Sequence, residues 1–147
     1  MIRILQGIDL VPVSKIKEIM LRRPRFGEEI FTTGEREYRL SRQDPYIHFA
    51  GRFAAKEAFL KALGTGLIGN GIDGSLREIE VVPGRGGRPE LSISGWAARI
   101  GSRKKINQFS VSISHSGDYA VASVILSAGG SEDMQMIKDE PHAIHAG

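Results

Sequence analysis

The spacing of apolar side chains predicts a strand and then an amphipathic helix at the start of the chain. Residues 2–10 are typical of a strand, with three isoleucines in register on one face and Asp9 off that register. Residues 13–22 carry apolar side chains at helical spacing, and the charged residues Lys15, Lys17, Glu18 and Arg22 fall between them. Pro24 ends this helix. The pattern therefore predicts a helix with a basic outer face.

Two more helices are expected before the middle of the chain. Thr32 and Glu35 have the spacing of a capping box, which predicts a helix that runs to about Arg42. A third and longest helix is expected over residues 46–63, because an Asp-Pro pair precedes it and Gly64 follows it. This helix is rich in Ala, Phe and Leu, so we expect it to be central.

Most of the remaining elements are expected to be strands. Strands over 76–82 and 89–93 are joined by a glycine-rich loop, and a short helix follows over about 94–103. Strict alternation over 109–114 predicts a half-buried strand, and a last strand is expected over 119–126. This order predicts an α+β fold, with a largely antiparallel sheet, a long central helix and two shorter N-terminal helices.

Length and composition fit one folded domain. Of the 147 residues 41% are hydrophobic and 25% charged, near the usual globular proportions, which argues against a disordered or fibrous chain. We expect a domain over residues 1–127, with its first strand part of the mature fold, and a polar, disordered tail over 128–147. Cysteine is absent, which excludes a disulfide framework and a thiol nucleophile and suits a reducing cytoplasm. No apolar run is long enough to span a membrane, so no membrane partner is expected.

The positive charge is concentrated in one part of the chain. The formal net charge is +3, but residues 131–147 hold four acids and one base, so residues 1–130 carry +6. Five bases and one acid lie between residues 15 and 25. Such a patch attracts an acidic partner, and both nucleic acid and an acidic protein qualify.

Asp9 is the first candidate for chemistry. A carboxylate inside an apolar strand carries a desolvation cost unless something pairs with it. We therefore expect a cation nearby. The alternative is that Asp9 lies at the exposed end of the strand or bonds to the backbone.

The long helix and the turn after it supply further candidates. Glu57 and Lys61 stand one turn apart, which is also the arrangement of an ordinary surface ion pair worth about 0.3–0.5 kcal/mol. The Gly64-Thr65-Gly66 turn lets backbone N–H groups approach a phosphate, although a helix end favours Gly64 in any case. His115 is a lone histidine at the end of a strand. Each feature, taken singly, has a structural explanation.

Taken in order along the chain, five segments are more specific than any one of them. They are Gly7-Ile8-Asp9-Leu10-Val11, Phe31-Thr32 with Glu35, the run from Arg52 to Gly66, Gly87-Arg88-Pro89, and Ser112-Ile113-Ser114-His115. Together they resemble the holo-[acyl-carrier-protein] synthases, the small group of 4′-phosphopantetheinyl transferases. The resemblance extends from the first strand to about Leu126, and the long-helix segment is its most specific part.

The resemblance implies a reaction and a metal. In this family the 4′-phosphopantetheine of coenzyme A is moved onto a serine of apo-acyl carrier protein, in fatty acid biosynthesis, with release of adenosine 3′,5′-bisphosphate and with Mg²⁺. Asp9 and Glu57 would hold the ion together with the coenzyme A pyrophosphate. Lys61 would neutralise charge on the leaving group. Glu57 or a water on the metal would accept the serine proton, and the sequence does not choose between them.

The same resemblance implies the contacts with both substrates. Coenzyme A would meet Lys61, Gly64, Thr65, Gly66, Arg88, Pro89, Ser114 and His115. The basic residues that would face the acidic carrier protein are Lys15, Arg22, Arg23 and Arg25. Members of the family are typically homotrimers with active sites between subunits, in the cytoplasm, and no nucleic-acid partner is implied.

The alternative function is a non-catalytic module that uses the basic helix to bind coenzyme A or nucleic acid. It accounts for the basic patch but gives no reason for Asp9 or Glu57. A transferase specialised for a polyketide or peptide carrier domain is a further possibility within the same chemistry.

Overall fold

The computed structural model describes residues 1–40, 43–65, 75–130 and 143–145. The elements are, in chain order, β1 (Arg3–Pro12), α1 (Val13–Arg22), α2 (Pro24–Ile30), α3 (Thr33–Leu40), α4 (Pro45–Leu63), η1 (Ser75–Glu78), β2 (Ile79–Pro83), η2 (Arg85–Gly87), β3 (Pro89–Ser94), α5 (Gly95–Arg103), β4 (Ile106–Ser116), β5 (Tyr119–Ala128) and β6 (Ala143–His145). The predicted α+β class with antiparallel pairing is confirmed.

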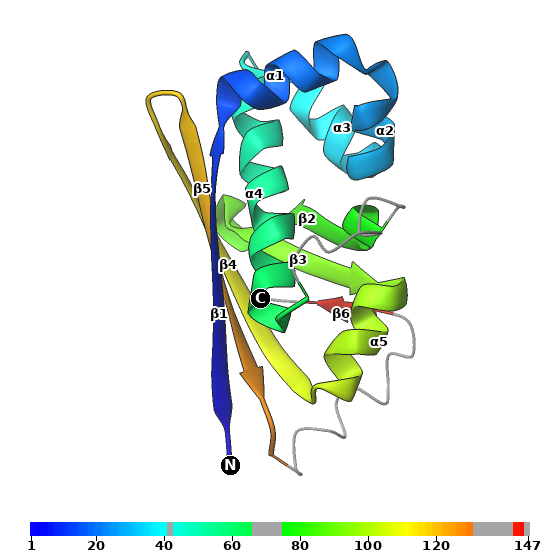
Figure 1. The fold of residues 1–147 in the computed structure, drawn as a ribbon. Coiled ribbons are helices and arrows are strands. Elements are labelled where there is room, and N and C mark those ends of the chain that lie inside the picture. The colour runs from blue at the N-terminus through cyan, green and yellow to red at the C-terminus, as the bar shows by residue number, and fades with distance from the viewer. Residues whose placement is uncertain (41–42, 66–74, 131–142, 146–147) are drawn as a thin grey trace.

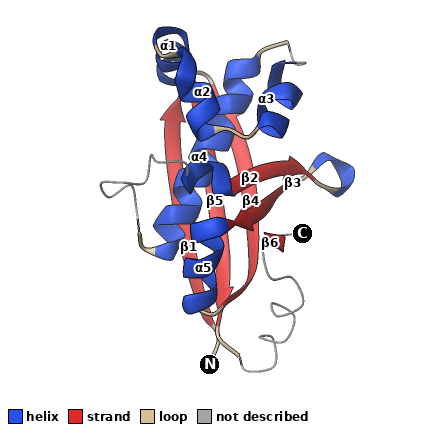
Figure 2. Ribbon diagram, turned by 90° about the vertical axis from the view of Figure 1, so that its right-hand side faces the viewer, coloured by secondary structure: helices blue, strands red, loops and turns tan. Residues whose placement is uncertain are grey.

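The core forms where α4 packs against one face of a three-stranded sheet with the order β1-β5-β4 (Figure 1). A smaller sheet, with the order β2-β3-β6, lies beside α4 (Figure 2). The Asp44 carboxylate accepts a hydrogen bond from the Tyr46 backbone N–H at 3.2 Å, and Gly64 ends the helix with a φ of 79°. Both predicted ends of the long helix are therefore confirmed.

The backbones of β1 and α4 approach each other closely at Gly7. A Cβ atom at Gly7 would overlap the Ala58 carbonyl oxygen and would lie 2.7 Å from the Ala62 nitrogen. Only glycine allows this approach. The contact sets the separation between the strand that carries Asp9 and the helix that carries Glu57.

The other face of the large sheet is apolar and exposed. Ile4, Ile8 and Leu10 of β1 are 65%, 60% and 60% exposed, whereas their neighbour Val11, on the helix side, is buried. The isoleucines share one face, as the alternation predicts, but that face points away from α4. The core of this chain therefore covers only one side of the sheet.

The N-terminal helices correct the prediction. Three short helices precede α4, not two, because Pro24 is the first residue of α2 as well as the stop after α1. Proline suits the first turn of a helix, where its missing N–H needs no partner. The strand expected over 76–82 begins only at Ile79, since η1 occupies the residues before it. In the described ranges no helix is long and apolar enough to cross a membrane.

The tail also departs from the prediction of disorder after residue 127. The last long strand runs through Ala128, and residues 143–145 form β6, which pairs antiparallel with β3. The edge of β3 offers backbone donors and acceptors that a short segment can pair with whatever its side chains are. A pairing of this kind leaves no hydrophobic pattern in the sequence. Residues 131–142 and 146–147 lie outside the described residues.

Candidate active site

Two elements bring a carboxylate and an ammonium group into contact. Asp9 lies on β1 and Lys61 lies in the last turns of α4. The Nζ atom of Lys61 lies 2.8 Å from Oδ1 of Asp9 and donates a second hydrogen bond, 3.1 Å long, to the Ile8 carbonyl oxygen. The Asp9 side chain is 11% exposed and that of Lys61 is 50% exposed. Within the chain, the cation expected near Asp9 is therefore Lys61.

Glu57 lies one turn before Lys61, and its carboxyl group is perturbed. Burial raises its pKa and the Asp9 carboxylate raises it further, while Lys61 and Lys15 lower it, with a resulting pKa of about 7. Lys61 forms its ion pair with Asp9 across two elements. The two lysines thus do not fully offset the effects of burial and of the neighbouring Asp9 carboxylate on the pKa of Glu57.

The donor set fits a hard divalent cation. Asp9 and Glu57 together supply four carboxylate oxygens, and Mg²⁺ is usually held by one or two carboxylates, with waters and substrate phosphates as its other ligands. Among the residues that the structure describes, no group of three or more acidic, histidine or cysteine ligands is found. The arrangement therefore fits an ion shared with a phosphate better than an ion enclosed by protein alone.

A buried lysine–glutamate pair begins one residue before Glu57, at Lys56, and goes beyond the sequence prediction. Lys56 is completely buried, and its Nζ atom donates three hydrogen bonds. These go to Oε1 of Glu35 at 2.7 Å, to the Leu76 carbonyl at 2.9 Å and to the Ile79 carbonyl at 2.8 Å. Burial lowers the pKa of Lys56, and the Glu35 carboxylate opposes that effect. Lys56 thereby ties α4 to α3, η1 and β2.

Glu35 is the centre of this buried network. The predicted capping box is present: the Thr32 backbone N–H donates to Glu35 Oε1 at 3.0 Å, and the Glu35 N–H donates to Thr32 Oγ1 at 3.1 Å. The other carboxylate oxygen of Glu35 accepts from the Val81 N–H at 3.1 Å. Capping-box spacing could have identified Glu35 as structural, but no sequence signal placed Lys56 against it.

The predicted carrier-binding residues are all exposed. Lys15 and Arg22 lie on α1, Arg23 follows it, and Arg25 lies on α2. Arg22 is paired with Glu18 at 3.0 Å, which reduces its free charge. Lys15 is the member of this group close enough to the site to act on Glu57.

The turn between β4 and β5 holds the start of α1 in place. Oδ1 of Asp118 accepts from the Ser14 N–H at 3.1 Å, and Oδ2 accepts from the Ser14 hydroxyl at 2.6 Å. The Asp118 carbonyl oxygen also accepts from the Val13 N–H at 2.7 Å. This cap fixes the helix that brings Lys15 to the site.

The turn after α4 has the structure of a helix end. The Thr65 N–H donates to the Leu60 carbonyl at 3.1 Å, and the Gly64 N–H donates to the Lys61 carbonyl at 3.0 Å. The helix-end explanation of Gly64 is therefore confirmed. Gly66 lies outside the described residues.

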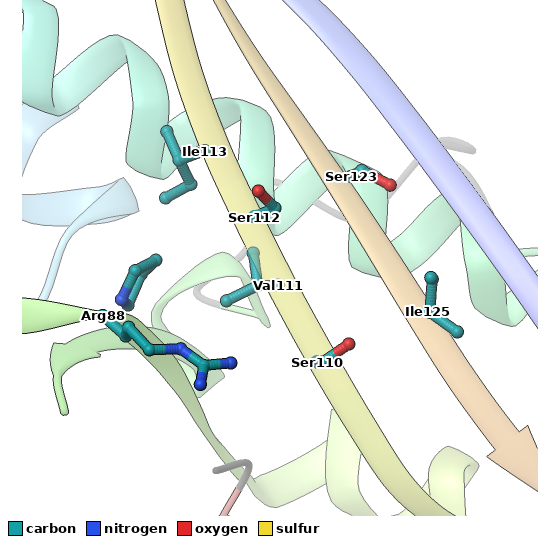
Figure 3. A pocket seen from close by; sticks show the side chains of 8 residues that line it. Arg88, Ser110, Val111, Ser112, Ile113, Ser123 and Ile125 are labelled. Carbon is teal, nitrogen blue, oxygen red and sulfur yellow. The ribbon is translucent and has the colours of Figure 1, made fainter. Parts of the chain in front are cut away.

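Arg88 and Pro89 lie away from the acidic pair. They line a cavity of about 300 Å³ against β4 and β5, whose side chains Ser110, Val111, Ser112, Ile113, Ser123 and Ile125 complete it (Figure 3). In Figure 3 the Arg88 side chain lies beside Val111. This chain alone does not bring Arg88 and Asp9 into one cavity.

Ser114 and His115 are consecutive on β4, so their side chains lie on opposite faces of the sheet. The pairing places His115 in line with Val11, on the face toward α4, and Ser114 in line with Leu10, on the exposed apolar face. Because β5 lies between β4 and β1, Ser114 and His115 are each about 10 Å, or two strand spacings, from the residue of β1 in line with them. The two residues therefore do not face one ligand within a single chain.

Comparison with known proteins identifies relatives over most of the chain. The model of the 4′-phosphopantetheinyl transferase superfamily matches residues 6–124. The chain is 42% identical over 124 residues to the holo-[acyl-carrier-protein] synthase of Caldanaerobacter subterraneus subsp. tengcongensis, an alignment that covers 84% of this chain and 94% of that protein. It is 46% identical over 124 residues to the protein of the same name from Carboxydothermus hydrogenoformans, with 82% and 94% covered.

A solved structure agrees with these sequences. The ACPS–CoA complex of Chronobacterium ammoniagenes superimposes with a TM-score of 0.74 at 34% identity, over 87% of this chain and 99% of that one. The matched fold is the one that carries Asp9 and Glu57 on β1 and α4 here.

Proposed function

Since the chain belongs to the 4′-phosphopantetheinyl transferase superfamily, among the holo-[acyl-carrier-protein] synthases, we propose that it transfers 4′-phosphopantetheine from coenzyme A to a serine of apo-acyl carrier protein. The serine hydroxyl oxygen forms a bond to the phosphorus that carries pantetheine. The bond from that phosphorus to the bridging pyrophosphate oxygen breaks, and adenosine 3′,5′-bisphosphate leaves. The observation that carries the proposal is the convergence of Asp9, Glu57 and Lys61.

Asp9 and Glu57 are the residues that would hold Mg²⁺. Bound there, the ion would neutralise pyrophosphate charge and polarise the phosphorus–oxygen bonds. The repulsion that raises the pKa of Glu57 supports this assignment, because an added cation favours the ionised form of both carboxylates.

Lys61 would stabilise the leaving group. Its ammonium group is half exposed and is held near Asp9 by two hydrogen bonds, so it can donate to a phosphate oxygen beside the carboxylates. A positioned positive charge is most effective where negative charge develops in the transition state. The serine proton goes to Glu57 or to a water beside Asp9.

We place the contact with coenzyme A on Lys61, on the turn after α4, on the cavity beside Arg88 and Pro89, and on the end of β4. Ser114 and His115 lie on opposite faces of the sheet. One coenzyme A molecule can therefore contact both residues only if a second subunit contributes to the site. The exposed apolar face of β1 supports a homotrimer with active sites between subunits. The transferase domain then corresponds to residues 1–127, of which the family model matches 6–124.

The acidic carrier protein would dock on α1 and α2. Four exposed bases, Lys15, Arg22, Arg23 and Arg25, lie there, and Leu21 among them is 65% exposed. Charge of one sign around an apolar side chain suits a partner of opposite charge with an apolar contact of its own. This arrangement brings the acceptor serine to the end of β1, near Lys15.

The proposal is tested by intact mass spectrometry of an apo-acyl carrier protein incubated with the protein, coenzyme A and Mg²⁺. We expect a mass gain of one phosphopantetheine group that disappears with EDTA. A gain that persists with EDTA would exclude the metal role of Asp9 and Glu57. No gain with any carrier protein, with coenzyme A still bound, would leave a binding module instead of a transferase.

A further inference from the structure

The start of β1 and the end of α5 lie toward the same end of the molecule (Figure 1). A cavity of about 380 Å³ lies between the residues of these segments. Four basic side chains line it together with Met1, Gly129 and Gly130; they are Arg3, Arg103, Lys104 and Lys105. Among the residues that the structure describes, no acidic side chain lines the cavity. Arg3 is separated from Asp9 by six residues of strand, or about 20 Å. Arg3 is therefore remote from the acidic pair, whereas the Lys104 ammonium reaches the end of α4, 3.8 Å from where a Cβ atom at Gly64 would lie.

The four basic side chains have no counter-charge among residues 1–40, 43–65, 75–130 and 143–145. The ion pairs found there involve Glu18, Glu35 and Asp9, and each of these carboxylates is paired with a different cation. All four basic residues are exposed. Like charges gathered around one hollow repel each other, and an anion in that hollow relieves the repulsion.

The helix dipole explains only part of this cluster. Arg103 and Lys104 lie at the C-terminal end of α5, where cations are favourable without any ligand. Arg3, however, comes from β1, a separate element. The helix dipole of α5 therefore gives no reason for the cation that β1 contributes to the cavity.

Lys105 occupies a backbone position that disfavours its side chain. Its φ is 60°, and in the described ranges it is the one residue other than glycine with a positive φ. Its carbonyl accepts from the Gly129 N–H at 3.0 Å, which joins the loop to the end of β5. Glycine would adopt this conformation without strain. A lysine in this conformation, at the edge of the cavity, points to a use for its ammonium group.

We propose that this cavity binds an anion that carries two or more phosphate groups close together. Guanidinium and ammonium groups recognise phosphate through charge-assisted hydrogen bonds, and the volume is that of a small-molecule site. The anion is either an inorganic polyphosphate or a nucleotide, because both present the same phosphate chemistry. Binding of this anion does not depend on the transferase function proposed above.

The test uses isothermal titration of the full-length protein with inorganic tripolyphosphate, in EDTA and at low salt. The variant Arg103→Gln/Lys105→Gly removes two cations, and Lys105→Gly also relieves the backbone, so the fold is expected to keep its melting temperature. We expect the affinity to fall by at least roughly ten-fold. Arg99→Gln, which removes an exposed cation from the same helix away from the cavity, is the matched control and should bind normally.

A second pair of variants separates this cavity from the active site. Lys61→Met should keep the tripolyphosphate binding event that Arg103→Gln/Lys105→Gly loses, because Lys61 does not line the cavity. Loss of binding in Lys61→Met with normal binding in Arg103→Gln/Lys105→Gly would overturn the proposal, as would absence of binding in the unmodified protein. Titration of Lys61→Met with adenosine 5′-diphosphate, a nucleotide that is not the proposed product, identifies the source: tighter binding than tripolyphosphate indicates a nucleotide, and weaker binding indicates an inorganic polyphosphate.

Discussion

Lys56 and Glu57 are neighbours on α4, yet they belong to two regions with opposite character. Lys56 is completely buried, and its three hydrogen bonds use all three ammonium protons. Glu57 is partly exposed, carries a raised pKa and has no ion-pair partner in the described residues. Around Lys56 every ammonium proton has a hydrogen-bond acceptor, whereas the Glu57 carboxylate is accessible to a ligand.

The difference shows how one helix serves two purposes. The Lys56–Glu35 pair fixes the helix against α3, η1 and β2, so these two charged groups stabilise the fold. Glu57 and Lys61 then emerge toward β1, where Gly7 lets the strand come close. A charged pair whose hydrogen bonds are all satisfied indicates a structural role, and a crowded pair of carboxylates indicates a site that awaits a cation.

The largest expected effect is the loss of stability in Lys56→Met. Removal of the lysine leaves the Glu35 carboxylate buried without its cation, and breaking a buried pair in this way costs about 3–5 kcal/mol. Urea unfolding measures the change. The double variant Lys56→Met/Glu35→Gln should recover part of the loss. Equal stability of Lys56→Met and the unmodified protein would contradict the structural role.

The next effect is on catalysis, in Glu57→Gln. The amide keeps the shape of the side chain but loses the negative charge that would hold the metal. We expect the transfer rate to fall by about 10²–10³-fold, the range seen when one electrostatic contact to the transition state is removed. The melting temperature should change little. A rate within a few-fold of the unmodified protein would exclude Glu57 from the metal site.

A smaller effect concerns pH and stability in EDTA. The folded pKa of Glu57, about 7, lies above its ordinary value of 4.5. Folding therefore favours the protonated form, and this contribution is present at low pH and lost as pH rises through 7. The melting temperature of Glu57→Gln relative to the unmodified protein should increase between pH 5 and pH 8.5. A difference that is constant with pH would show that Glu57 ionises normally.

The smallest effect is expected at the carrier surface. Lys15→Gln and Arg23→Gln should each raise the KM for carrier protein by about 2- to 5-fold, because single exposed charges contribute little. The effect should shrink as salt is added. Arg99→Gln, on α5, serves as the control. An unchanged KM at low salt in both variants would place the carrier protein on another surface.

Much of this fold could be predicted from local patterns. The caps at Asp44 and Gly64 and the capping box at Thr32 are short-range signals, and all three are confirmed. The missed helix α2 follows from the double meaning of Pro24, which can stop one helix and begin another. The β6 strand was missed because a three-residue edge pairing depends on backbone groups.

The site was predictable as a set of residues but not as a geometry. Asp9 within an apolar strand indicated a nearby cation, but its partner Lys61 is 52 positions away in the sequence and comes close through the packing of α4 on β1, which Gly7 permits. Similarly, the i,i+4 spacing of Glu57 and Lys61 predicted an ion pair along the helix, whereas tertiary structure directs Lys61 to Asp9. The burial of Lys56 also depends on elements distant in sequence.

In the proposed mechanism Asp9 and Glu57 form the metal site, whereas the Glu35–Lys56 pair does not. The most direct test is paramagnetic broadening of backbone amide signals by Mn²⁺, which has the same preference for oxygen ligands as Mg²⁺. We predict broadening centred on residues 8–10 and 56–58, competed by Mg²⁺ and lost in both Asp9→Asn and Glu57→Gln. Broadening centred elsewhere, or unchanged in those variants, would contradict the claim.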